Sequence, residues 1–163
     1  LAVEKQHDML FLDFPTDSLE QLSAENTAII EQCIGTAPHE TYKGKTDYMA
    51  VLSSQQQVET LKPDLAKLAI LGERGVIVTA KGDGVDFVSR FFAPQSGIDE
   101  DPVTGSAHTT LTPYWAKALG KNELTAIQVS ARKGYLACRY LGERVAISGN
   151  AVTYLTGEIE VNG

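Results

Sequence analysis

The densest group of polar side chains lies in residues 97–108, which read Gly-Ile-Asp-Glu-Asp-Pro-Val-Thr-Gly-Ser-Ala-His. This segment stands at the start of a predicted helix. Asp101 before Pro102 fits a helix N-cap followed by proline at the first helical position, and Thr104 is an alternative cap. Either start leaves several backbone N–H groups unpaired at the helix end, and such groups bind anions, for example a carboxylate.

The side chains at this helix start suit the binding of a small acid. Gly105 lets a ligand approach the backbone closely, because it has no side chain. Ser106 can donate a hydroxyl hydrogen bond, and Asp101 can hold a cationic amine or move a proton. The same residues also fit a plain helix cap with a solvated acidic turn, and composition and spacing alone favour this simpler interpretation.

A metal site in the segment is a weaker interpretation. The spacing of a calcium loop is absent, and three adjacent acids cannot converge on one ion without strain. The four candidate ligands are Asp99, Glu100, Asp101 and His108. His108 fits a packed, hydrogen-bonded histidine better than a ligand or a base. We therefore expect no metal.

Four further residues have side chains that could react or bind a ligand, but they are predicted to be core residues. Cys33 and Cys138 sit on apolar faces, and two cysteines make neither a disulfide scaffold nor a zinc site. Tyr114 and Trp115 belong to the weakly charged helix, so we expect them to pack inside rather than stack on a ligand.

The elements that must position the helix start can be read from periodicity and turn residues. A helix should run from Val103 to Leu119, buried on most sides because it carries little charge, with a kink or break at Pro113 and an end at Gly120. Two other helices are expected, one capped at Asp17 or Ser18 and ending at Gly35, and one from Pro63-Asp64 to Gly72. Strands are expected at 9–14, 47–52, 75–80, 85–92, 126–131, 135–140, 144–148 and 151–160. The last four should form an antiparallel meander. The fold class is therefore α+β, a mixed or antiparallel sheet wrapped around a central buried helix.

Composition limits the class of protein. The chain has 163 residues, a net charge of −7 and 43% apolar residues, values of a globular domain. Acidity without a basic cluster argues against nucleic acid and anionic membrane surfaces as partners. No apolar run approaches the ~20 residues of a membrane span. Two cysteines favour a cytoplasmic setting, and the start at Leu1 suggests that something upstream is absent.

Several motifs resemble the phenazine-biosynthesis PhzF-like family. The most specific is Glu-Asp-Pro-Val-Thr-Gly-Ser-Ala, residues 100–107. Matches continue in the same order at 12–15, 86–94, 113–115, 119–121, 128–130 and 144–149. One departure is Lys133, where the family usually shows a second glycine, and it affects the geometry of the local turn.

The resemblance implies a diaminopimelate-epimerase-like fold of two similar halves, with the active site in the cleft between them. It implies a cofactor-independent isomerase that shifts a proton on a small amino- or hydroxy-acid. Asp101 and Ser106 fall on active-site positions and are our predicted catalytic residues. Thr104, Gly105 and Ser106 are the predicted substrate-binding residues. Epimerases of this fold place a cysteine base at the helix start, and neither cysteine is near it here.

The resemblance also concerns the extent of the chain. The family carries an acid/base glutamate and a Cys-Gly-His-Ala-type motif upstream, and neither occurs in residues 1–163. We therefore expect residues 1–163 to be a single unit, the C-terminal half of the protein and inactive alone. Its terminal strands, about 1–15 and 151–161, would pack on the missing half. The other expected partners are a small anionic acid and a second copy in a homodimer. The alternative is a non-catalytic module for small-acid binding or protein association.

Overall fold

A computed structural model describes residues 2–6 and 9–160 of the chain. Eleven strands form one mixed sheet, in the order β1-β2-β11-β10-β9-β7-β6-β5-β4-β3, with β8 beside β7. Among the described strands, only the β5–β6 and β7–β9 pairs are parallel. The strands are β1 (Ala2–Gln6), β2 (Met9–Pro15), β3 (Glu20–Gln21), β4 (Glu40–Lys43), β5 (Asp47–Val51), β6 (Gly75–Lys81), β7 (Phe87–Ala93), β8 (Ile98–Asp101), β9 (Glu123–Gln128), β10 (Gly134–Tyr140) and β11 (Arg144–Asn150). The helices are α1 (Ala24–Ile34), α2 (Gln55–Thr60), α3 (Leu65–Leu68) and α4 (Gly105–Leu119), with a 3-10 turn at Pro94–Ser96.

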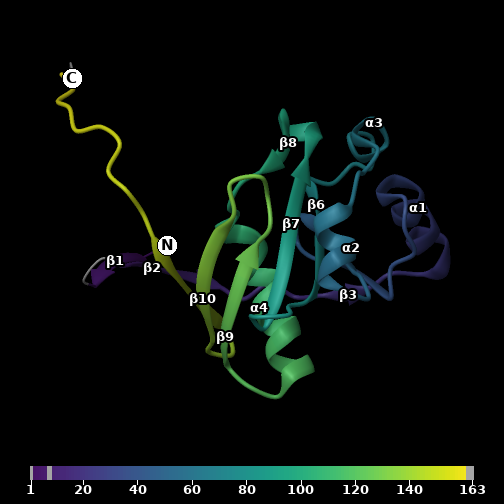
Figure 1. Ribbon diagram of the computed structural model, residues 1–163, viewed down its shortest axis with the longest axis horizontal. Coiled ribbons are helices and arrows are strands. Elements are labelled where there is room, and N and C mark those ends of the chain that lie inside the picture. The colour runs from purple at the N-terminus through teal and green to yellow at the C-terminus, as the bar shows by residue number, and fades with distance from the viewer. Residues whose placement is uncertain (1, 7–8, 161–163) are drawn as a thin grey trace.

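The central strands bury both faces, which explains their nearly continuous apolar sequences. In β6, Ile77 faces the core around α4, whereas Val76 and Val78 face the core under α1, α2 and α3. Successive side chains of a strand point to opposite faces, so one strand contributes to both cores. Figure 1 shows α1, α2 and α3 gathered on one side of β6 and β7. The predicted buried strand at 75–80 is confirmed.

Helix α4 lies in the hollow of the sheet, as predicted. Strands β5, β6, β7, β9, β10 and β11 all contribute side chains to its core, so the sheet wraps around it. Leu111 and Trp115 are almost fully buried there, and the Trp115 indole donates to Thr79 Oγ1 at 3.0 Å. The α+β class and the wrapped central helix are confirmed.

Of the kink or break expected at Pro113, the break does not occur, because α4 runs continuously through this residue. A proline inside a helix leaves the carbonyl four residues earlier without its usual N–H donor. Here the N–H of Asp17 donates to that carbonyl, Thr109 O, at 3.2 Å. A segment remote in sequence thus replaces the lost hydrogen bond.

Two other sequence predictions are wrong. Helix α1 starts after Ser23, whose Oγ accepts from Asn26 N at 3.3 Å, and not at Asp17 or Ser18. Residues 151–160 form no strand: they are exposed and run away from the sheet (Figure 1). No neighbour in the described residues pairs with their backbone groups, and a strand requires such a partner. Leu1, His7–Asp8 and Val161, which belong to the predicted terminal strands, lie outside the described residues.

The sequence did not predict four strands that are short or polar, namely β1, β3, β4 and β8. Helix α2 escaped it too, although Ser54 caps it by accepting from Gln57 N. Among residues 2–6 and 9–160, no helix has the length and apolar character needed to cross a bilayer.

Candidate functional site

Helix α4 begins at Gly105, and the turn before it is held by a buried glutamine. Gln128, at the end of β9, accepts from Thr104 N at 2.8 Å through Oε1 and donates to Asp101 O at 2.6 Å through Nε2. Thr104 occupies the N-cap position, but its side chain makes no cap hydrogen bond. Instead its hydroxyl donates to Asp101 Oδ2 at 2.6 Å. The cap at Asp101 was therefore wrong, since Asp101 ends β8, and the alternative cap position Thr104 is the observed one.

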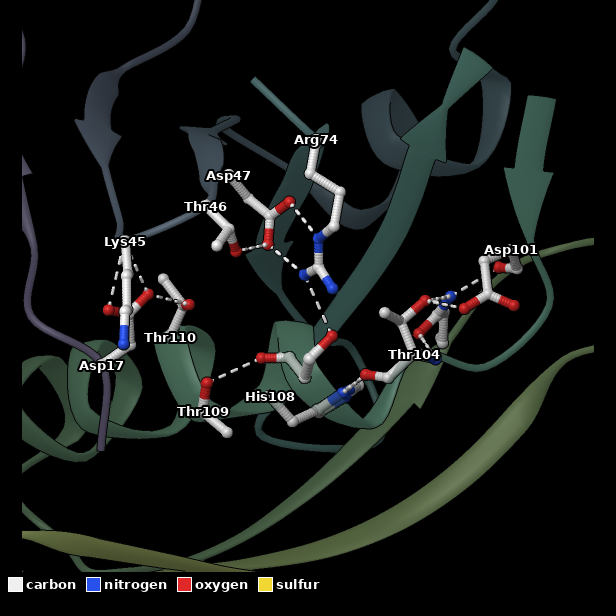
Figure 2. A network of polar contacts seen from close by, with 12 residues as sticks. Asp17, Lys45, Thr46, Asp47, Arg74, Asp101, Thr104, His108, Thr109 and Thr110 are labelled. Atoms are coloured by element: carbon white, nitrogen blue, oxygen red, sulfur yellow. Dashed lines mark hydrogen bonds and ion pairs between the residues drawn. The ribbon is translucent and has the colours of Figure 1, made fainter. Parts of the chain in front are cut away.

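An ion pair between half-buried Arg74 and buried Asp47 faces the start of α4. Arg74 donates from Nε to Asp47 Oδ1 at 2.9 Å and from Nη2 to Asp47 Oδ2. The same Nη2 donates to Ser106 Oγ at 3.0 Å, and the guanidinium lies over the Phe91 ring at 5.3 Å. Asp47 is only 2% exposed, so this carboxylate is fixed in place. Figure 2 shows Arg74 between Asp47 and the first turn of the helix.

The start of α4 presents charged and polar hydrogen-bond donors, and the charge of the Arg74 guanidinium is balanced by the Asp47 carboxylate. The hydrogen bond to Asp47 raises the pKa of Arg74, against the opposing effect of burial, so the guanidinium stays charged. The first N–H groups of a helix lack partners within the helix and carry partial positive charge, and no side chain of the described residues caps those of α4. Ser106 and Gly105 are half-buried, so a ligand can reach them. The arrangement suits a small anion.

The neighbouring loop keeps the helix start in position. Ser130 Oγ donates to Pro102 O at 2.8 Å. Gly134 lies against Val103, and a Cβ built on it would stand 2.2 Å from Val103 Cγ2. Lys133 has φ 57°, the left-handed region that favours glycine. Lys133 therefore departs from the family pattern in residue type, while its backbone has a conformation that a glycine would also adopt.

His108 is a buried core histidine, as predicted. Its Nδ1 lies 2.8 Å from Thr104 O, and burial lowers its pKa to about 4. The ring is therefore neutral near pH 7. Its Nε2 has no partner among the described residues. Because His108 is fully buried, a ligand at the helix start cannot contact its ring.

The metal interpretation finds no support in the described residues. Glu100 is bound in a bidentate ion pair to Arg90, at 2.7 and 2.9 Å. His108 is fully buried, with its ring 5.9 Å from that of Phe87. Residues 2–6 and 9–160 contain no cluster of three or more His, Cys, Asp or Glu side chains that could hold a metal.

The predicted core residues behave differently from one another. Cys33 and Cys138 are buried free thiols, and burial raises the pKa of Cys138 to about 12. Trp115 stacks on Phe87 at 5.8 Å. Tyr114 is only half-buried, and its hydroxyl donates to Glu40 Oε2 at 2.8 Å. The prediction of a core tyrosine at 114 is thus only half correct.

The structure brings all four predicted site residues to one place, and it adds three that sequence reasoning missed. Asp101, Thr104, Gly105 and Ser106 surround the start of α4. The additions are Asp47, Arg74 and Gln128, contributed by β5, by the residue before β6 and by β9. A charged residue directly before a buried strand, as at Arg74, was a usable signal. The sequence could not show that Arg74 pairs with Asp47. The two residues are neighbours only because the parallel β5–β6 register places Asp47 opposite Gly75, the residue after Arg74.

The comparisons with known proteins agree with the motifs. The chain is 48% identical over 162 residues to an uncharacterized isomerase of Pseudomonas aeruginosa, covering 99% of this chain and 61% of that protein. It is 36% identical to phenazine biosynthesis-like domain-containing protein 1 of Mus musculus, covering 98% of this chain and 62% of that protein. A crystal structure of a PhzF-family phenazine biosynthesis protein from Enterococcus faecalis superposes with a TM-score of 0.89 and 42% identity, covering 98% and 60% of the two chains.

The extent of these matches bears on two expectations. The chain spans about three fifths of the length of the curated relatives, 61% for the Pseudomonas protein. The expectation that it is only a C-terminal half is not borne out, and the comparisons give no support to inactivity of the chain alone. The family described as phenazine biosynthesis-like protein matches residues 2–157. The chain therefore belongs to the phenazine biosynthesis-like PhzF family.

Proposed function

We propose that the start of α4 binds the carboxylate of a small amino- or hydroxy-acid, as part of a cofactor-independent isomerase that acts by proton transfer. The observation that carries the proposal is the Arg74 guanidinium, held by Asp47 and donating to Ser106 Oγ at 3.0 Å. It places a fixed positive charge, a hydroxyl and the helix N–H groups around one point. Relatives named isomerases support the reaction class.

This arrangement would favour removal of a proton next to a carboxylate. As the proton leaves, negative charge moves onto the carboxylate oxygens. Fixed donors aimed at those oxygens stabilise the charge without rearranging, which is the largest single contribution in many enzymes. In this proposal Ser106, Gly105 and the Thr104 turn hold the acid. Asp101 accepts a hydrogen bond from its amino or hydroxyl group, or carries the proton.

The proposed mechanism needs further groups, and the relatives have a part of their sequence that this chain does not cover. We propose that this remaining part supplies the second acid/base group, the glutamate that the family resemblance implies. We propose also the diaminopimelate-epimerase-like architecture of two similar halves, a homodimer and a cytoplasmic location. Two free buried cysteines fit that location.

A non-catalytic small-acid-binding module is the second candidate. It is favoured because two nearby groups that could act as bases are occupied or inaccessible. Asp47 is bound to Arg74, and His108 is buried with a lowered pKa. Asp101 is then the predicted acid/base residue left at the helix start, and proton transfer in both directions usually needs two groups.

Solvent deuterium exchange distinguishes the two candidates. The complete protein is incubated in D2O with a panel of amino- and hydroxy-acids, and loss of the proton next to the carboxylate is followed by NMR. Calorimetry measures binding of the same acids. Exchange that is lost in Asp101→Asn supports the isomerase, whereas binding without exchange supports the module. Absence of both binding and exchange across the panel would reject the proposal.

A further inference from the structure

A pocket lies along the C-terminal half of α4, away from Ser106. It has a volume of about 840 Å³, within the range of small-molecule sites. Its lining includes Glu40, Tyr42, Tyr114 and Tyr140 from β4, α4 and β10. We call it the tyrosine pocket. Its first lining residue on α4, Pro113, is seven residues after Ser106. A helix rises about 1.5 Å per residue, so about 10 Å of helix separates the pocket from the anion site.

A carboxylate held by two tyrosines forms one wall of this pocket. Glu40 Oε2 accepts from Tyr42 OH at 2.8 Å and from Tyr114 OH at 2.8 Å. These hydrogen bonds, Tyr114 first, lower the pKa of Glu40. Both tyrosine rings are also fixed: their centroids are 5.6 Å apart, and Tyr114 packs edge-on against Trp115 at 5.2 Å. The wall is therefore anionic and rigid before any ligand arrives.

The rest of the pocket adds negative potential. Asp17 lines it, and its carboxylate already accepts from Thr110 Oγ1 and from the Lys45 N–H. The C-terminal end of α4 lies here too, where Ala116 O accepts from both Gly120 N and Lys121 N. The carbonyls after it have no helical partner and carry partial negative charge. The whole chain has a net charge of −7.

Within the described residues, no cation of the chain covers these rings. The three cation–ring contacts are Lys43 with Tyr48, Arg74 with Phe91 and Arg90 with Phe92. Lys121 is directed elsewhere, in an ion pair with Asp86 at 2.6 Å. Lys117 lines the pocket and is exposed, so it is the one lysine that opposes a cationic ligand here.

We propose that the tyrosine pocket binds a small organic ammonium ion, with Glu40 as its charge partner and the rings of Tyr42 and Tyr114 as its contact surface. Ring faces attract ammonium groups, and an adjacent carboxylate adds to the attraction. A divalent metal fits less well, because the described residues contain no cluster of three ligating side chains. This site is separate from the proposed isomerase site and does not depend on it.

A pair of probes with one shape and different charge tests the proposal. The full chain is titrated at constant ionic strength with choline, and separately with its neutral isostere 3,3-dimethylbutan-1-ol. NMR follows the Gly120 and Asn122 amides and the Trp115 indole N–H. We expect saturable shifts with choline and affinity for the neutral probe lower by about tenfold. Equal shifts from both probes, or no saturation with choline, would overturn the proposal.

Variants then assign the binding to the named residues. Glu40→Gln and Tyr42→Leu should each weaken choline binding by about tenfold, whereas Lys117→Ala should leave it equal or tighter. Matched controls are Glu25→Gln on α1 and Tyr154→Phe on the exposed terminal segment. If Tyr42→Leu unfolds the chain, Tyr42→Phe keeps the ring and should keep most of the affinity. Unchanged binding in Glu40→Gln would overturn the proposal.

Discussion

Replacing Gly134 by alanine tests how tightly the loop before β10 supports the helix start. The new Cβ would stand 2.2 Å from Val103 Cγ2, 3.0 Å from Cγ1 and 3.2 Å from Cβ, so Val103 must move. Gly134 is not among the positive-φ glycines, so the cost is steric and not conformational. Overpacking of this kind costs about 1–3 kcal/mol. Val103 precedes Thr104, so the displacement should also reach the Arg74–Ser106 site.

The assay is urea unfolding of the wild-type chain and Gly134→Ala, with the Trp115 fluorescence as signal. The midpoint should fall with an unchanged slope, and the melting temperature should drop by roughly 3 °C per kcal/mol. Val103→Ala removes both Cγ atoms and should relieve the clash. The double variant should therefore be more stable than the sum of the two single changes predicts, by about 1–3 kcal/mol. A Gly134→Ala chain within ~0.5 kcal/mol of wild type, or simple additivity, would refute the reasoning.

Three further predictions concern the site and its buried histidine. Ser106→Ala should weaken binding of a small carboxylate to the complete protein by about 1 kcal/mol or more, measured by calorimetry, and equal affinities would leave Ser106 a plain helix residue. Asp101→Asn should lower turnover of the complete enzyme far more than its stability, because Asn still accepts the Thr104 hydroxyl; full activity would reduce Asp101 to a structural role. His108 has a folded pKa of about 4, below its unfolded value of about 6.5, so the unfolded state binds the extra proton. The contribution of neutral His108 to the free energy of unfolding is fully present above pH 6.5 and is lost as the pH falls towards 4. This loss is at most about 3 kcal/mol. Unfolding titrations of wild type and His108→Gln across this window should diverge, and parallel curves would contradict the assigned pKa.

Local sequence signals were sufficient for the central helix and the buried strands. Helix α4 was readable because burial excludes charge from residues 103–116, and Gly120 ends it with φ 67°. The strand at 75–80 was readable because both of its faces are buried. Helix caps and periodicity depend on neighbours a few residues away, so a single sequence carries them.

Elements that need a distant partner were not readable in the same way. Residues 151–160 have strand-like composition but no neighbour to pair with in the described chain. Asp17 resembles a helix cap, yet its carboxylate serves Thr110 Oγ1 instead, 93 residues away. Conversely, polar Glu40–Lys43 becomes strand β4 because β5 lies beside it. Backbone hydrogen bonds across a sheet, rather than composition, decide such segments.

The candidate site divides along the same line. Asp101, Thr104, Gly105 and Ser106 are close in sequence, so one helix start brings them together, and the motif alone identified them. Asp47, Arg74 and Gln128 reach that point only through the parallel β5–β6 and β7–β9 pairs and the placement of α4 between them. Which cation faces the helix start is therefore a property of strand register, and register is settled by packing over the whole sheet.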